Sequence, residues 1–176
     1  PDNFNAALWG CPGTVISGAD GTGYGDGQQN TADILAGCND SWFQALFVST
    51  YEREGYDDWY IPSKDELLLM HQTLGYGSSN NVLGFGPGAT YWSSTEIDAN
   101  YAWALRTFSS GSSPWIQKSK HHLPGIKVVR SFTIDANSSN YSYNWSPTNE
   151  TTSSITAQPT TTTTYTVDVT SGSTTC

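Results

Sequence analysis

Most of the side chains that could bind a ligand lie between residues 94 and 120. Tyrosine and tryptophan can stack on a sugar ring or anchor a protein partner, while acids, amides and cations supply hydrogen bonds. We therefore predict a ligand-binding surface formed by Glu96, Asp98, Asn100, Tyr101, Arg106, Trp115, Gln117, Lys118 and Lys120. The alternative is that these residues form an ordinary polar edge of a sheet.

The positive charge of this acidic chain, whose formal net charge is -9, is concentrated between residues 118 and 130. The basic side chains there are Lys118, Lys120, His121, His122, Lys127 and Arg130. They could form an anion site, or they could balance the acidic remainder of the chain. A metal site at His121 and His122 is disfavoured, because neighbouring side chains on a strand point to opposite faces.

A glycine-rich loop, ADGTGYGDG, places Asp20 and Asp26 as candidate calcium ligands. Calcium loops wrap the ion with oxygen atoms from alternate positions and end on a bidentate glutamate at the twelfth position. Thr31 stands at that position, so a turn-rich loop explains the same residues. We expect no metal and no other cofactor.

No catalytic constellation is evident in the sequence. A nucleophile elbow, a phosphate-binding loop and an ordered Ser/His/Asp set are all missing from the sequence. Asp57, Asp58 and Glu66 are carboxylates close in sequence, but Glu66 is used by a predicted helix cap. The chain is therefore predicted not to be an enzyme.

Two short helices are predicted in the first third of the chain. Asn30 caps the first, which covers ADILAG and ends at Gly37. Asp40 or Ser41 caps the second, which runs over residues 42–52. Helical spacing places one face of the second helix at Trp42, Ala45, Leu46 and Ser49.

A third helix is predicted between Ser63 and Gly75, because Ser63 and Glu66 have the S-x-x-E spacing of a capping box. Its apolar stripe consists of Leu67, Leu68, Met70 and Leu74. Strands are predicted at residues 90–95, 101–108, 115–119, 126–132, 141–146, 153–159 and 162–170. Both faces of 101–108 carry apolar groups, which indicates a central strand.

The composition of the chain changes after Arg130. No lysine or arginine occurs from residue 131 to the end, and serine and threonine become abundant. We therefore predict two domains, 1–132 and 133–176, in an α+β protein whose second module is a small all-β unit. The acidic net charge disfavours nucleic acid as a partner, and no apolar run predicts membrane insertion.

Three cysteines are present: Cys11, Cys38 and Cys176. Cys11 and Cys38 fall in the first domain and could form a disulfide, or all three could be free thiols. In the first case Cys176 would find its partner beyond this segment or on another chain.

Several motifs in the first region occur in the order GYGDGQQNTADI, GYDDWYIPSKDEL, YWSSTE, AWALRTFSSG and KVVRSF. From about Trp9 to Phe132 the chain resembles the Lcl-like C-terminal domain family, which terminates collagen-like adhesins. The resemblance implies a C-type-lectin-like fold with two main helices and a looped, mostly antiparallel sheet. It also implies that Trp59 and Trp92 build the core, and that the anion site, if formed, would take a sulfated or acidic glycan.

The second region resembles the tandem Ig-like or PKD-like repeats of large bacterial surface adhesins, which are common with type IX secretion. Its roughly 44 residues are short against the ~100 residues of a complete sandwich, so the module is expected to be incomplete. The two resemblances imply a secreted, non-catalytic adhesion segment at the cell surface that binds a glycan or a protein. The alternatives are an assembly unit of an extracellular filament or secretion complex, joined to neighbouring Ig-like repeats or other chains, and a phage receptor-binding protein.

Overall fold

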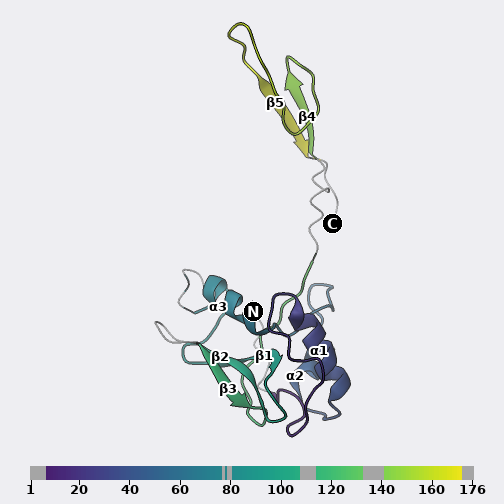
Figure 1. Ribbon diagram of the computed structural model, residues 1–176, viewed down its shortest axis with the longest axis vertical. Coiled ribbons are helices and arrows are strands. Elements are labelled where there is room, and N and C mark those ends of the chain that lie inside the picture. The colour runs from purple at the N-terminus through teal and green to yellow at the C-terminus, as the bar shows by residue number, and fades with distance from the viewer. Residues whose placement is uncertain (1–6, 77, 79–80, 108–113, 133–140, 172–176) are drawn as a thin grey trace. The chain divides into compact units, whose positions relative to one another are not determined.

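The computed structural model describes residues 7–76, 78, 81–107, 114–132 and 141–171. The chain divides into two compact units, Pro1–Ser131 and Phe132–Cys176 (Figure 1). The first contains three helices and a three-stranded antiparallel sheet, and the second a two-stranded antiparallel ribbon. The α+β class with antiparallel sheets is therefore confirmed. Among the described residues, no helix has the length and apolar character needed to cross a membrane.

The sheet of the first unit separates its core into two parts. Its strands are β1 (Thr90–Glu96), β2 (Tyr101–Arg106) and β3 (Trp115–Ser119), in the order β1-β2-β3, so β2 is central as predicted. Residues opposite each other in a ladder share a face. The core face therefore carries Thr90, Trp92, Ala102, Ala104, Arg106, Ile116 and Lys118, and the aromatic face carries Tyr101, Trp103, Leu105, Trp115 and Gln117.

Each face is covered by a different hydrophobic cluster. Trp92, Ala102 and Ala104 pack with residues of the N-terminal segment and of two helices, α1 (Asp26–Gly37) and α2 (Gln44–Val48). On the aromatic face, Leu105 packs with Leu67 of α3 (Lys64–Leu74) and with Phe85 and Tyr91. Two covered faces explain why β2 carries apolar side chains in both directions.

Helix α3 begins as the sequence predicts. The Ser63 hydroxyl accepts a hydrogen bond from the Glu66 backbone N–H, and the Glu66 carboxylate accepts one from the Ser63 N–H at 2.8 Å. Of the expected apolar stripe, only Leu67 is fully buried, Leu68 and Met70 are partly buried, and Leu74 is 42% exposed. The stripe that α3 buries is therefore narrower than predicted.

Helix α1 starts earlier than predicted, and Asn30 is not its cap. Asn30 is buried inside the helix, where its side-chain amide donates to the Gly21 carbonyl at 2.7 Å and its oxygen accepts from the Gly21 N–H at 3.1 Å. A Cβ added at Gly27 would lie 2.3 Å from the Glu66 carboxylate and 2.8 Å from the Ile61 carbonyl. The start of α1 therefore involves contacts with residues outside the helix, and the spacing of residues within the helix does not predict these contacts.

Helix α2 is shorter than the predicted 42–52, and its predicted face is right for Ala45 and Leu46 but wrong for Trp42 and Ser49. Phe43, Ala45 and Val48 are buried, whereas Trp42 is 54% exposed. The Gln44 N–H donates to the Leu8 carbonyl at 2.9 Å, so pairing with the N-terminal segment sets the orientation of the helix.

Residues 126–132 were predicted to form a strand, and the structure has isolated bridges there instead. Tyr60 and Val129 exchange two backbone hydrogen bonds, and Gly125 pairs in parallel with Tyr91. These bridges hold the end of the first unit against two segments that lie far apart in the sequence.

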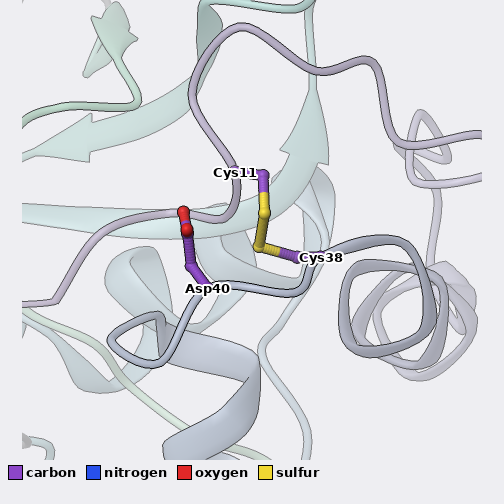
Figure 2. Close-up of side chains that lie close together, drawn as sticks. All are labelled: Cys11, Cys38 and Asp40. Carbon is purple, nitrogen blue, oxygen red and sulfur yellow. A yellow bond between two sulfur atoms is a disulfide. The ribbon is translucent and has the colours of Figure 1, made fainter.

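Cys11 and Cys38 form a disulfide (Figure 2). Cys38 is the residue that ends α1, and Cys11 belongs to the N-terminal segment that packs on the core. The bond therefore joins this segment to the end of α1. The prediction for Cys176 falls outside the described residues.

The second unit consists of β4 (Tyr141–Ser146) and β5 (Thr166–Ser171), in which Tyr143 pairs with Val169 and Trp145 with Val167. The predicted strand 153–159 is absent, and β5 begins later than the predicted 162. None of residues 142–170 is buried.

Candidate functional site

The aromatic face of the sheet carries a partly open group of rings beyond the residues that α3 covers. Trp103 and Trp115 are half-buried, with ring centroids 6.5 Å apart and ring planes at 79°. The Lys64 ammonium lies 4.2 Å from the Trp103 centroid and 5.5 Å from that of Trp115, within the range of cation–π attraction. Tyr101, 44% exposed, and exposed Gln117 lie on the same face. We call Lys64, Tyr101, Trp103, Trp115 and Gln117 the aromatic platform.

The structure thus brings together Tyr101, Trp115 and Gln117, three of the residues predicted to bind a ligand. Trp103 and Lys64 were missed. The two-residue alternation from Tyr101 was available as a signal for Trp103, because Tyr101 and Trp103 must share a face of β2. Lys64 follows the cap of a helix, and nothing in its local sequence places it over two tryptophans of the sheet.

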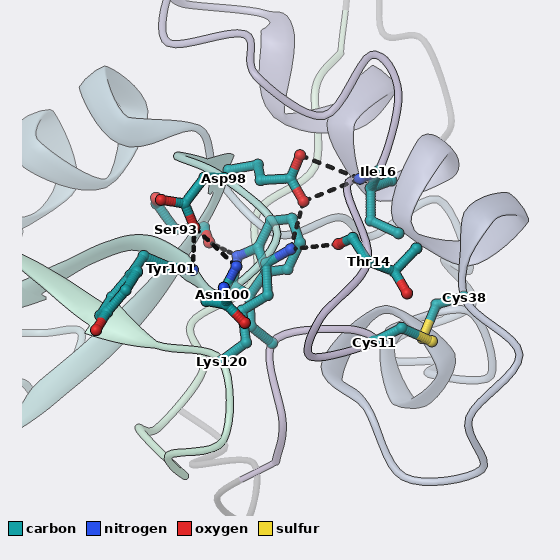
Figure 3. A network of polar contacts seen from close by, with 11 residues as sticks. Cys11, Thr14, Ile16, Cys38, Ser93, Asp98, Asn100, Tyr101 and Lys120 are labelled. Atoms are coloured by element: carbon teal, nitrogen blue, oxygen red, sulfur yellow. Dashed lines mark hydrogen bonds and ion pairs between the residues drawn. A yellow bond between two sulfur atoms is a disulfide. The ribbon is translucent and has the colours of Figure 1, made fainter.

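Asp98 and Asn100 form the turn before β2 instead of joining the platform (Figure 3). The Asp98 carboxylate accepts hydrogen bonds from the backbone N–H of Asn100 at 2.7 Å and of Tyr101 at 2.9 Å. The Asn100 carbonyl accepts from the Lys120 N–H at 2.8 Å. Asp98 therefore orients the backbone from which the Tyr101 ring projects.

Glu96 and Lys120 are corrections to the predicted ligand surface. Glu96 is 7% exposed and Lys120 is fully buried, and their side chains form an ion pair. The Glu96 carboxylate also accepts from the Ile16 N–H at 2.9 Å, while the Lys120 ammonium donates to the Thr14 carbonyl at 2.9 Å (Figure 3). This pair attaches the N-terminal segment to the sheet and is inaccessible to a ligand.

The pairing of β1 with β2 is irregular just before Glu96. Between Trp92 and Glu96 the register with β2 shifts, and the polar residues of YWSSTE lie in the bulge. The Ser93 hydroxyl donates to the Trp103 carbonyl at 2.9 Å, and the Thr95 hydroxyl to the Gly21 carbonyl at 2.7 Å. Trp92 is fully buried as expected, and Trp59 is partly buried against the same core.

The basic residues between 118 and 130 do not form one anion site. Besides Lys120, Lys127 is buried and donates to the Leu83 carbonyl at 2.7 Å, and burial lowers its pKa. Arg130 makes two hydrogen bonds to Asp58, at 2.8 and 3.0 Å, and these bonds lower the pKa of that carboxyl group. Lys118 and Arg106 lie on the core face, opposite the aromatic platform.

The structure offers no support for a calcium loop. Asp26 accepts from the Gly23 N–H at 2.8 Å, as a turn requires, and Asp20 is exposed. Within the described residues, the one group of three potential metal ligands is Cys11, Cys38 and Asp40 (Figure 2). Its sulfur atoms are bonded to each other, whereas thiolates are needed to hold a metal, so this group does not fit an ion.

Comparisons with models of known families, with characterised proteins and with solved structures found no match to the chain.

Proposed function

We propose that the first unit is a C-type-lectin-like domain that binds a glycan through the aromatic platform, without catalysis. The supporting observation is the pair of nearly perpendicular tryptophans beside an exposed tyrosine on one face of a rigid sheet. The chain would be an adhesion segment of a secreted bacterial surface protein, as its sequence motifs imply. The second unit would be part of an Ig-like spacer.

The platform has the chemistry that a sugar ring needs. Tryptophan and tyrosine rings offer flat apolar surfaces for the C–H groups of the sugar, and polar neighbours bind its hydroxyl groups. Gln117 and the Lys64 ammonium supply such donors at the border of the rings. Strand pairing fixes Trp103 and Trp115, and Asp98 fixes the start of β2, so little ordering is required on binding.

A glycan array followed by calorimetry tests this proposal. Tyr101→Ala removes the most exposed ring of the platform, and we expect it to weaken binding about tenfold or more, the equivalent of about 1.4 kcal/mol. Tyr24→Ala is the matched control, since Tyr24 is 69% exposed in the same unit and lies outside the platform. A folded domain that binds no glycan, or equal losses for the two variants, would contradict the proposal.

A second candidate function is assembly into an extracellular filament, and the β4–β5 ribbon favours it. Val169 is 53% exposed and Val167 37% exposed, opposite Tyr143 and Trp145. An isolated two-stranded ribbon with such a face is marginally stable in water, so further strands from neighbouring repeats or other chains would stabilise it. Light scattering over a range of concentrations tests this candidate, and a strictly monomeric chain would rule out assembly through this unit.

A further inference from the structure

A pocket of 290 Å³ lies at the border of the core face, away from the platform. It is lined by Thr90, Lys118, His122, Leu123, Pro124 and Gly125. Backbone hydrogen bonds from Gly125 N–H to the Thr90 carbonyl at 2.9 Å, and from Trp92 N–H to the Gly125 carbonyl at 3.0 Å, hold one wall against β1. We propose that this pocket binds a carboxylate-bearing sugar, with Lys118 as the partner of the carboxylate.

Lys118 differs from the other cations of the chain. The sequence has 7 lysines and arginines, all of them described. Lys120 and Arg130 pair with carboxylates, Lys127 binds a carbonyl, and Lys64 lies over tryptophan rings. Arg53 pairs with Glu54, and the side chain of Arg106 also has an interaction partner. Among these cations, the side chain of Lys118 alone has no hydrogen-bond, ion-pair or ring partner within the described residues.

An unpaired ammonium beside a concave surface favours an anion. Because one side of the ligand would be shielded from water there, its attraction to Lys118 exceeds that at an open lysine. Arg106 lies directly opposite Thr90 on the same face, so it adds positive charge near the pocket. The formal net charge of -9 makes this local positive potential an exception in the chain.

The other walls of the pocket suit a sugar ring better than a bare inorganic anion. Leu123 and Pro124 provide an apolar wall, and Thr90 provides a hydroxyl group. The His122 Nδ1 lies 3.2 Å from the Ser119 carbonyl, so donation by Nδ1 leaves Nε2 as the second polar atom of the ring. The volume is at the small end of ligand pockets, which matches a single sugar unit.

Titration of the ¹⁵N-labelled chain with sodium galacturonate, followed by NMR, tests this assignment. We expect the amide signals of Lys118, His122 and Gly125 to shift with a dissociation constant on the order of 1 mM, which is about 4 kcal/mol of binding. Lys118→Gln should weaken binding about tenfold or more, since it removes a charged hydrogen-bond partner. Lys118→Arg should retain binding, because it keeps the charge.

Two further ligands and one control variant complete the experiment. Methyl galactoside, which lacks the carboxylate, should not shift the pocket signals, and equal shifts would overturn the role of Lys118. Inorganic phosphate that binds more tightly than galacturonate would overturn the sugar assignment. Lys64→Gln, on the platform, should leave galacturonate binding unchanged. Galacturonate shifts confined to Tyr101 and Trp103 would overturn the pocket while leaving the proposed platform intact.

Discussion

The two units of the chain differ in how they bury their sheets. In the first, both faces of a three-stranded sheet are covered, and Trp9 and Trp92 are fully buried. In the second, one ladder joins two strands, and none of residues 142–170 is buried. Burial of apolar surface is the main stabilising term in folding, so the first unit has its own source of stability. The described part of the second unit lacks this source, since Val167 and Val169 are exposed.

The units also differ in their buried polar groups. The first encloses Asn30, Glu96 and Lys120, and each of them binds the backbone of a distant segment. A satisfied polar network fixes one arrangement of the loops, but it is costly to break, because the partner left behind remains buried. The most damaging substitutions are therefore expected at polar residues of the first unit.

The largest effect is expected for Lys120→Ala. It leaves the Glu96 carboxylate buried without its counter-ion, and such a loss costs about 3–5 kcal/mol of the free energy of unfolding. Urea unfolding followed by tryptophan fluorescence measures it, since the Lys120 ammonium lies 4.6 Å from the Trp9 ring. Lys118→Ala, two residues away and partly exposed, should change the same quantity by about 0.5 kcal/mol or less. Equal effects of the two variants would contradict the structural role given to the pair.

The elements that sequence reasoning predicted well are those with local signals. The capping box at Ser63 and Glu66 marks the start of α3, and the period-two alternation marks β2 as central. The elements predicted poorly depend on distant contacts. Asn30 is drawn into α1 by Gly21 and Ser94, and Leu8 orients α2 through Gln44. Neither contact can be predicted from the spacing of residues in the sequence.

The same distinction holds for the candidate site. Residue types alone pointed to Tyr101, Trp115 and Gln117, which the sheet does bring to one face. The types of Glu96 and Lys120 gave the wrong prediction, because both side chains are buried and pair with each other and with the N-terminal segment. The alternation of the strands was an available signal, because Glu96 has the parity of Trp92 and Lys120 that of Lys118, and both Trp92 and Lys118 lie on the core face.

The next largest effect is expected from removing the disulfide. Cys11 and Cys38 are 27 residues apart in sequence, and the bond restricts that loop in the unfolded chain. The double variant Cys11→Ala/Cys38→Ala should lose about 2–4 kcal/mol of the free energy of unfolding of the first unit. Denaturation of the variant and the parent under non-reducing conditions measures the difference. An unchanged midpoint in the variant would show that the bond adds nothing to this unit.

A smaller effect should appear as a pH dependence at His71. Burial lowers the pKa of its imidazole below the ordinary 6.5, and its Nδ1 is buried without a hydrogen-bond partner in the described structure. Below pH 6.5 the unfolded chain therefore binds the proton more readily than the native state does. The free energy of unfolding should thus decrease as the pH is lowered below 6.5.

Unfolding free energies measured between pH 7.5 and pH 5 test this expectation. The decrease should be smaller in His71→Leu, which has no titrating group at this position. His121→Gln, at an exposed histidine, should keep the decrease of the parent protein. If the parent and His71→Leu show the same decrease, other groups are responsible for it.

The smallest effect is expected in the ribbon, where one substitution compares the two units directly. Val48 is fully buried in the first unit and Val169 is 53% exposed in the second, and Val→Thr puts the same hydroxyl group at either position. A buried hydroxyl without a partner costs about 1–3 kcal/mol, whereas an exposed one changes stability by about 0.5 kcal/mol or less. Val48→Thr should thus lower the unfolding midpoint of the first unit, and Val169→Thr should leave it unchanged, because every residue of the two core clusters belongs to the first unit.

A lower midpoint in Val169→Thr would mean that the first unit draws stability from the ribbon. If assembly covers the ribbon, Val169→Thr should instead shift the association seen by light scattering, which separates an effect on assembly from an effect on folding.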